Sequence, residues 1–360
     1  MELARKCIRE SKPYIAGKPI EETKRELGLR EVIKLASNEN PLGASPRALK
    51  AIRQAAGKVN LYPDSNGFYI KQAIARANGL SPANVVLGNG SDELIDIIIK
   101  TFLEPDENIV TSDTTFVEYE IICGTYGRAV KKAALKDFRY DLRALRDLVD
   151  AKTKLVFIAN PNNPTGTYVN AKDMDSFISS LPENVITVID EAYDTFIDVD
   201  DYPSGKSYLG KRNVLVLKTF SKAYGLAGLR IGYCLGDVSL TANMEKARQP
   251  FNVNLLAQKA ALAALGDKAF LKKTREVTLA GKKYLCREFD ALGLRYIPSA
   301  TNFILVDVKK DCGGVFRDLL RLGVIVRDMK QYKLDSFIRV TIGKPAENRK
   351  FIAALKKVLS

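Results

Sequence analysis

The sequence predicts an α/β protein with a three-layer large domain, built on a mostly parallel sheet, and a smaller α+β domain. Between about residues 84 and 235, apolar or period-2 segments typical of strands alternate with helical patterns. This alternation predicts βαβ units whose helices cover both faces of the sheet. The chain has 360 residues, which is enough for one large domain with a smaller companion.

After residue 235 the pattern changes to helices followed by short strands. Helical patterns cover residues 239–249, 255–265 and 268–292. The last of these ends at Gly293, a residue type that is common just after a helix C-terminus. Short strands and then a terminal helix are expected at residues 302–308, 324–327, 337–342 and 346–358. The predicted division is a large domain of residues 44–263 and a small domain of residues 1–43 with 264–360.

Three polar segments follow directly on predicted strands of the large domain. The strands and the segments after them are 154–159 with Asn160–Gly166, 184–189 with Asp190–Tyr193, and 214–217 with 218–232. Because ligands of α/β proteins bind at the carboxyl ends of parallel strands, these segments are expected to meet at one site.

The segment 218–232 places a lysine among groups that can bind a phosphate. Thr219, Ser221 and the guanidinium of Arg230 can surround one phosphate, and Lys222 lies between them in the sequence. A reactive amine beside a phosphate site is typical of pyridoxal phosphate (PLP), which proteins hold by a Schiff base to lysine and by its phosphate.

The two upstream segments carry the groups that the ring of PLP requires. Asp190, at the end of a buried strand, can keep the pyridine nitrogen protonated, so that the ring accepts electrons. Asn163 and Tyr193 can donate hydrogen bonds to the phenolic oxygen. The three segments together therefore predict a PLP site.

Further motifs follow one another in the order known from one enzyme family. They are PYIAGKPIEETKRELGL, LASNENPLG, LYPD, LGNGSDELI, NPNNPTG, VIDEAY, TFSKAYGLAGLRIGY, RQPFNV, GVIVRD and FIRVTIG. With this series the chain resembles the fold-type I PLP-dependent aminotransferases (class II aminotransferase family), and within them the histidinol-phosphate aminotransferases most closely. The series covers the chain nearly end to end, whereas any one motif alone would be a weak signal.

The resemblance implies a reaction and its partners. Histidinol phosphate and 2-oxoglutarate would be converted to imidazole-acetol phosphate and glutamate, a step of histidine biosynthesis. The resemblance also implies a homodimer in which Tyr62 of LYPD is donated to the cofactor phosphate across the interface.

The resemblance also implies roles for individual residues. Lys222, Asp190 and Tyr193 would be catalytic. Cofactor contacts would come from Ser91, Asp92, Phe116, Asn163, Asp190, Tyr193, Thr219, Ser221, Lys222, Arg230 and Tyr62. Within this set, Phe116 would stack on the ring, and Ser91 and Asp92 would open a helix whose N–H groups meet the phosphate. Substrate contacts would come from Arg339, Arg327 and Tyr14.

Other functions stay open at this point. A threonine-phosphate decarboxylase or an aromatic amino-acid transaminase would share the same lysine, aspartate and phosphate site. Leu61 departs from the family, in which many members carry arginine before the tyrosine. Taken singly, each residue also has a structural explanation; Arg327 and Arg339, for example, could form surface ion pairs. A basic nucleic-acid-binding or regulatory protein of the same fold is the non-enzymatic alternative.

Composition narrows these alternatives. Histidine is absent, which excludes Ser-His-Asp and Cys-His catalysis and histidine-ligated metal sites, and no metal is expected. The formal net charge is +14, but the basic residues are spread along the chain between acids, as on a solvated surface, so no nucleic acid is expected.

The five cysteines are scattered, which predicts free thiols in the cytoplasm. No apolar run approaches the length of about 18 residues that a membrane helix needs, so no membrane partner is expected.

Overall fold

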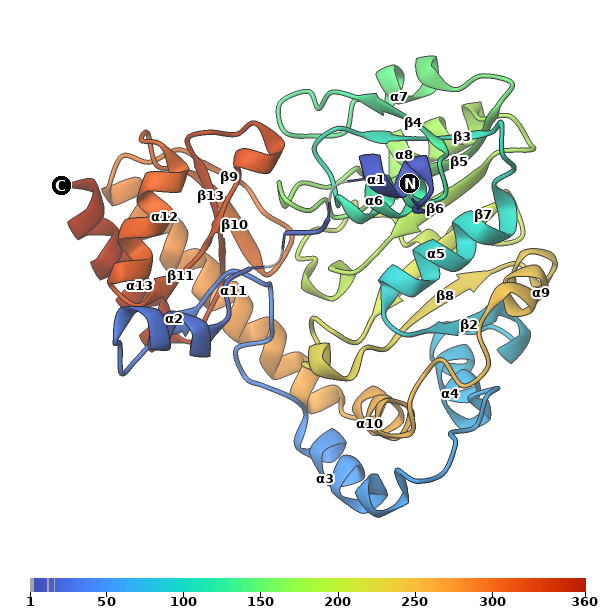
Figure 1. The fold of residues 1–360 in the computed structure, drawn as a ribbon, viewed down its shortest axis with the longest axis horizontal. Helices are drawn as coiled ribbons and strands as arrows, with labels where there is room; N and C mark the ends of the chain where they lie inside the picture. Colours follow the sequence, from blue (N-terminus) through green and yellow to red (C-terminus); the bar gives the residue numbers. More distant parts are fainter. Residues whose placement is uncertain (1–2, 12, 16) are drawn as a thin grey trace.

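The computed structural model describes residues 3–11, 13–15 and 17–360. Within these residues, seven strands form the central sheet of a larger unit (Figure 1). In spatial order they are β2 (Val85–Gly88), β8 (Gly232–Gly236), β7 (Val214–Thr219), β6 (Ile186–Asp190), β5 (Thr153–Ala159), β3 (Asn108–Ser112) and β4 (Ala129–Ala133). Strand β8 is antiparallel to both of its neighbours, and the other adjacent pairs are parallel. The predicted mostly parallel sheet is therefore confirmed.

Helices cover both faces of this sheet. One face carries α3 (Pro46–Ala55), α4 (Phe68–Asn78), α7 (Leu142–Leu148), α8 (Ala171–Ser180) and α10 (Leu255–Leu265). The other face carries α5 (Ser91–Phe102), α6 (Glu118–Thr125) and α9 (Val238–Ala247). Successive strand residues point to opposite faces, so each face has its own apolar cluster. The predicted three layers are confirmed.

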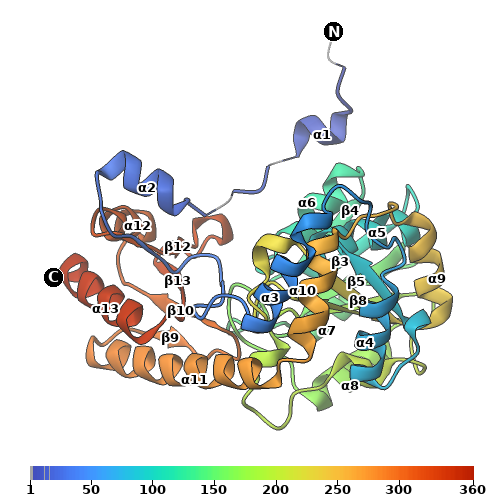
Figure 2. The same ribbon diagram turned by 90° about the horizontal axis from the view of Figure 1, so that it is seen from below.

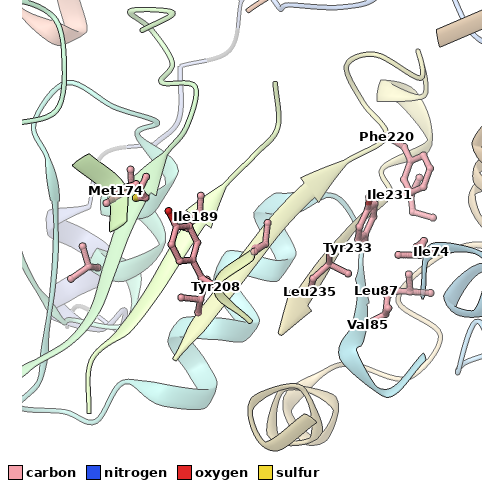
Figure 3. Close-up of a cluster of buried hydrophobic side chains, with 14 of the residues drawn as sticks. Ile74, Val85, Leu87, Met174, Ile189, Tyr208, Phe220, Ile231, Tyr233 and Leu235 are labelled. Atoms are coloured by element: carbon pink, nitrogen blue, oxygen red, sulfur yellow. The ribbon is translucent and has the colours of Figure 1, made fainter. Parts of the chain in front are cut away.

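Buried side chains from neighbouring strands and helices fill the first of these clusters. Figure 3 shows Val85 and Leu87 of β2 close to Tyr233 and Leu235 of β8 and to Ile74 of α4. Each of these side chains is buried. This packing fixes β2 and β8, and with them the start of α5 and the end of β7, where the polar segments emerge.

A smaller unit contains the C-terminal elements and part of the N-terminal region (Figure 1). Its antiparallel sheet has the order β12 (Arg327–Asp328), β13 (Phe337–Thr341), β10 (Phe303–Asp307) and β9 (Tyr296–Ile297). Its helices are α2 (Ile20–Leu27), α11 (Lys268–Ala291), α12 (Cys312–Arg321) and α13 (Pro345–Leu359). Figure 2 shows α11 running along one side of this unit towards the larger one.

One predicted strand of the smaller unit is divided in two. The sequence predicts a single strand over residues 324–327, but β11 (Val324–Ile325) pairs in parallel with β1 (Ile33–Lys34), whereas β12 pairs with β13. The chain changes sheets at Val326, because β1 and β13 belong to different sheets. Arg327 is thereby placed on the four-stranded sheet opposite Arg339.

The domain boundaries stay a prediction, which the distribution of buried residues supports. One cluster contains residues between Ala48 and Ala264, and another contains Leu35 with residues from Leu285 to Leu355. The short helix α1 (Lys6–Glu10) contacts α6 of the larger unit. Across the described residues, no helix has the length and apolar character that crossing a membrane requires.

Candidate active site

A pocket of about 340 Å³ opens at the carboxyl edge of the large sheet and extends to the smaller unit. Asp190 ends β6, Thr219 ends β7, and Asn163 follows β5, so the strand ends bring the three polar segments together as predicted. The predicted site residues that line this pocket are Tyr14, Ser91, Asp92, Phe116, Asn163, Asp190, Tyr193, Thr219, Ser221, Lys222, Arg230, Arg327 and Arg339.

Lys222 lies in the loop between β7 and the 3-10 turn η5 (Ala227–Leu229). Its Nζ donates a hydrogen bond to the carbonyl oxygen of Ser37 over 3.2 Å and lies 5.8 Å from the centre of the Tyr193 ring. Burial and the nearby Arg339 guanidinium lower the pKa of Lys222 to about 8. A substantial fraction of this amine is therefore neutral near physiological pH, as a nucleophile or base must be.

Asp190 is buried and is held by two donors. Its Oδ2 accepts a hydrogen bond from the Tyr119 hydroxyl over 2.7 Å, and its Oδ1 accepts one from the Ala192 N–H over 3.0 Å. Burial raises the pKa of Asp190 to about 6, although both hydrogen bonds oppose this change. The group is therefore a fixed carboxylate at neutral pH, in a position suited to a cationic partner.

Tyr193 is oriented by Asn38. The Asn38 Nδ2 donates to the Tyr193 hydroxyl oxygen over 2.9 Å, so the phenolic hydrogen is left to donate elsewhere. Burial raises the pKa of Tyr193 to about 12 and keeps the phenol protonated. Asn38 has a φ of 55° and is held by two hydrogen bonds with Thr341 of β13. The smaller unit thus helps to position a side chain of the larger unit.

The side of the pocket near α5 is built for an anion. Gly90, with a φ of 87°, directly precedes α5, so the N–H groups of Ser91 and Asp92 are among the unsatisfied donors of a helix N-terminus. The guanidinium of Arg230 reaches this place and contacts Asp92 Oδ2 over 3.0 Å and Ser221 Oγ over 3.4 Å. A Cβ atom at position 90 would lie 2.5 Å from Arg230 Nη2 and would displace this guanidinium, and the positive φ also favours glycine here.

Two further guanidinium groups line the pocket. Arg339 is buried, donates to the carbonyl oxygen of Ala36 over 2.7 Å and to Asn163 Oδ1, and its Nε has no hydrogen-bond partner among the residues that the structure describes. Arg327 donates to the carbonyl oxygen of Ile15 over 2.6 Å and to Gln331 over 3.2 Å. A buried, incompletely paired guanidinium is a suitable partner for a carboxylate or phosphate.

Tyr62 is the one predicted site residue that does not line the pocket. It is 83% exposed and stacks on Phe251, with ring centroids 4.7 Å apart. Within a single chain, Tyr62 therefore does not contribute to the pocket.

Among the residues at or next to the pocket that were not predicted, three have side chains that bear on the site. Asn38 and Tyr119 hold Tyr193 and Asp190, and Glu118 contributes a carboxylate to the lining. Tyr119 lies in α6, whereas Phe116 precedes this helix and contacts the Tyr119 ring edge-on, so helical periodicity does not link the two residues. Asn38 lies within the LASNENPLG motif, but its hydrogen bond to Thr341, 303 residues away, could not be read from that motif.

The loop that carries Lys222 passes close to the N-terminal segment at Gly225. This residue has a φ of +70°, and a Cβ atom there would lie 2.0 Å from the Gly43 carbonyl oxygen. The Gly225→Ala variant is therefore expected to lose at least about 2 kcal/mol of unfolding free energy. Gly228→Ala, in the same loop but with open space around its Cβ, is the control and should change by less than about 0.5 kcal/mol. Urea unfolding of both variants measures this, and equal stabilities would contradict the close contact.

Comparison with known proteins identifies the family. The family model for aminotransferase class I and II matches residues 30–355. A histidinol-phosphate aminotransferase from Moorella thermoacetica is 47% identical over 99% of this chain and 93% of its own length. Another from Carboxydothermus hydrogenoformans is 45% identical over 99% of both chains. The crystal structure of histidinol-phosphate aminotransferase from Sinorhizobium meliloti in complex with pyridoxal-5'-phosphate has 33% identity, covers 100% of this chain and 98% of its own, and superposes with a TM-score of 0.92.

These matches cover nearly the whole chain, as the series of motifs does. They confirm the resemblance that the motifs predict and the fold type that it implies. The chain therefore belongs to the aminotransferase class I and II family.

Proposed function

We propose that this protein is a PLP-dependent transaminase that transfers an amino group between histidinol phosphate and 2-oxoglutarate, giving imidazole-acetol phosphate and glutamate in a reversible reaction. The observation that carries this proposal is the content of one pocket. A lysine of lowered pKa, a buried carboxylate and an anion site lie together with two additional guanidinium groups. Relatives of 45–47% identity that are named histidinol-phosphate aminotransferases support the choice of substrate.

The residues present fit PLP. Lys222 would hold its aldehyde carbon, and Asp190 would hold its ring nitrogen. The N–H groups at the start of α5, together with Thr219, Ser221 and Arg230, would hold the phosphate. The absence of a Cβ atom at Gly90 supports this fit, because a side chain there would push Arg230 out of the anion site. Asn163 and Tyr193 would donate to the phenolic oxygen, and Phe116 would cover the ring.

When bound, PLP supplies an aldehyde that reacts with amines and a ring that draws electrons from the substrate Cα. The protein's own groups then control proton positions. The Lys222 amine removes the proton from the substrate Cα, a role for which its lowered pKa is suited. Asp190 stays ionised and fixed by Tyr119, and Tyr193 keeps its proton because burial raises its pKa.

Arg327 and Arg339 would bind the anionic ends of the two substrates. One half-reaction presents a phosphate monoester and the other presents dicarboxylates, and a pair of guanidinium groups can bind either kind of anion. Arg339 would bind the α-carboxylate of glutamate, since its Nε still lacks a partner among the described residues. Arg327 would bind the distal carboxylate or the phosphate, with Tyr14 beside it in the pocket lining.

A substrate assay tests the proposal. Purified protein with PLP, histidinol phosphate and 2-oxoglutarate is expected to form glutamate over many turnovers. Threonine phosphate is the comparison substrate, and release of carbon dioxide from it, without glutamate formation from histidinol phosphate, would show a decarboxylase instead. Phenylalanine in place of histidinol phosphate tests the aromatic transaminase. The cytoplasm stays the predicted location.

We also infer that the protein acts as a homodimer with Tyr62 reaching the site of the other subunit. Large apolar side chains are exposed around this residue and would be covered by a second copy. They are Val59, Leu61, Tyr62, Phe68, Tyr69 and Phe251. The pocket of one chain has an anion site at α5 but no tyrosine from LYPD, which a second subunit would supply.

A mixing experiment tests this sharing of residues. Lys222→Ala and Tyr62→Phe variants are each expected to have low activity, but after unfolding and refolding together they should form hybrid dimers with one intact site. Random association would restore about a quarter of wild-type activity, because half of the dimers are hybrids and each has one intact site of two. Activity that stays at the average of the two variants would contradict the donation of Tyr62 to a second subunit.

A further inference from the structure

The pocket contains one carboxylate whose role the proposed function leaves open. Four acidic residues line it: Glu39, Asp92, Glu118 and Asp190. Asp92 pairs with Arg230 over 3.0 Å, Glu39 pairs with Lys34 over 3.0 Å, and Asp190 accepts from Tyr119 over 2.7 Å. Glu118, in contrast, has no hydrogen bond or ion pair from its side chain among the residues that the structure describes.

Glu118 lies in the pocket lining, near Asp92 at the start of α5. It is the first residue of α6, two positions after Phe116, and its side chain is half-buried. A carboxylate in the first turn of a helix is stabilised by the helix dipole, and this alone could explain the residue type. The dipole does not explain why the carboxylate lines a pocket, where burial and the nearby Asp92 raise the pKa of Glu118 above its ordinary value.

Charge determines which part of a substrate can lie against Glu118. Phosphate and carboxylate groups are repelled by a carboxylate, and Arg327 and Arg339 offer them a better place. The reacting amine must lie at Lys222. Histidinol phosphate has one polar group left, its imidazole ring, which carries an N–H donor and becomes cationic near neutral pH.

We propose that Glu118 is a specificity residue that accepts a hydrogen bond from the imidazole N–H of the substrate. This inference rests on the proposed function, because it concerns the amine donor of that same reaction. A hydrogen bond between a carboxylate and an imidazole is charge-assisted and therefore strong. Glutamate and 2-oxoglutarate have no ring, so Glu118 acts in one half-reaction and has no role in the other.

The two half-reactions therefore provide the test. The variants are Glu118→Leu and Glu118→Gln, and the control is Glu120→Gln, whose exposed side chain pairs with Lys132 outside the pocket. With histidinol phosphate, Glu118→Leu is expected to lower kcat/KM about 10- to 100-fold, the range for a hydrogen bond to a charged group. Glu118→Gln, which keeps an acceptor oxygen, should lose less. With glutamate, all three variants should stay within about twofold of the wild type.

A matched substrate separates ring recognition from a general loss of function. 2-Amino-3-phenylpropyl phosphate has the same amine and phosphate but no ring N–H. The wild type should prefer histidinol phosphate to this compound, and Glu118→Leu should lose most of that preference. A readout without turnover is the binding of histidinol phosphate to the Lys222→Ala protein by calorimetry, which should weaken by a similar factor when Glu118→Leu is added.

Three results distinguish the possible failures. If both half-reactions fall equally in Glu118→Leu, the residue supports the site as a whole and the inference is overturned. If neither half-reaction changes, Glu118 has no contact with the ring, which also overturns it. If the wild type forms no glutamate from histidinol phosphate, the proposed function itself fails.

Discussion

Replacing Lys222 by methionine is expected to lower kcat for transamination by at least about 10³-fold. General acid–base catalysis alone contributes about 10²–10⁴-fold, and the variant also loses the amine that would hold the cofactor. Methionine has a similar length and no charge, so the fold should persist. The rate of glutamate formation measures this effect. The control is Lys272→Met, which removes an exposed lysine of α11 and should leave the rate unchanged.

The same variant is expected to be more stable than the wild type when cofactor is absent. Burial lowers the pKa of Lys222 from 10.5 to about 8, so between these values the unfolded chain binds more protons than the folded one. The contribution of Lys222 to the free energy of unfolding of the wild type therefore rises with pH from about 8 to 10.5. At pH 7 the buried charge lowers this free energy by up to about 3 kcal/mol.

Urea unfolding of the cofactor-free proteins at pH 7 and pH 10.5 tests this. The advantage of Lys222→Met should be large at pH 7 and small at pH 10.5. An advantage that does not depend on pH would mean that the amine is not held in a desolvated position.

Replacing Asp190 by asparagine is expected to lower kcat by about 10²–10³-fold, the range for removal of one preorganised charged or polar group. The amide has the size of the carboxylate but cannot balance a protonated ring nitrogen. The dissociation constant for PLP, measured by fluorescence quenching, should rise in the same variant. A variant with wild-type kcat and PLP affinity would show that Asp190 has no role in holding the cofactor.

Tyr119→Phe provides a finer test of the same carboxylate. The Tyr119 hydroxyl donates to Asp190 and lowers the pKa of this buried acid towards about 6. Without that donor, the pKa of Asp190 in the cofactor-free protein should move up by about 1–2 units, since hydrogen bonds to charged groups are worth about 1.5–3 kcal/mol. Because a raised carboxyl pKa makes the free energy of unfolding fall with pH until that pKa is passed, the fall should continue to a higher pH in the variant than in the wild type. Urea unfolding of both cofactor-free proteins between pH 5 and 8 measures this, and the same pH dependence in both would contradict the role of the Tyr119 hydroxyl.

Much of the fold and pocket could be predicted because the signals are local. Helix α10 occupies residues 255–265, as predicted, and α11 ends just before Gly293. Asp190 and Thr219 are each the last residue of a parallel strand, so the rule that such ends meet at one edge was enough to bring them together. The predicted lining is thus a consequence of sheet topology.

The features that sequence reasoning missed depend on contacts between distant segments. Val326 separates two short strands because β11 pairs with β1, whereas β12 pairs with β13. Asn38 adopts a left-handed φ and orients Tyr193 through a network that includes Thr341, which no local pattern records. Glu118 differs from the other acids of the pocket because its side chain has no hydrogen bond or ion pair among the described residues. This difference depends on the positions of its neighbours, which the sequence does not give.

The most direct test of the central claim is to find where PLP is attached. The protein is incubated with PLP, reduced with borohydride, digested and analysed by mass spectrometry. One equivalent of the reduced cofactor on Lys222 is the predicted result, and Asp190→Asn should show weaker labelling at low PLP concentration. Modification that is spread over surface lysines, or that persists unchanged in the Lys222→Met variant, would contradict the account.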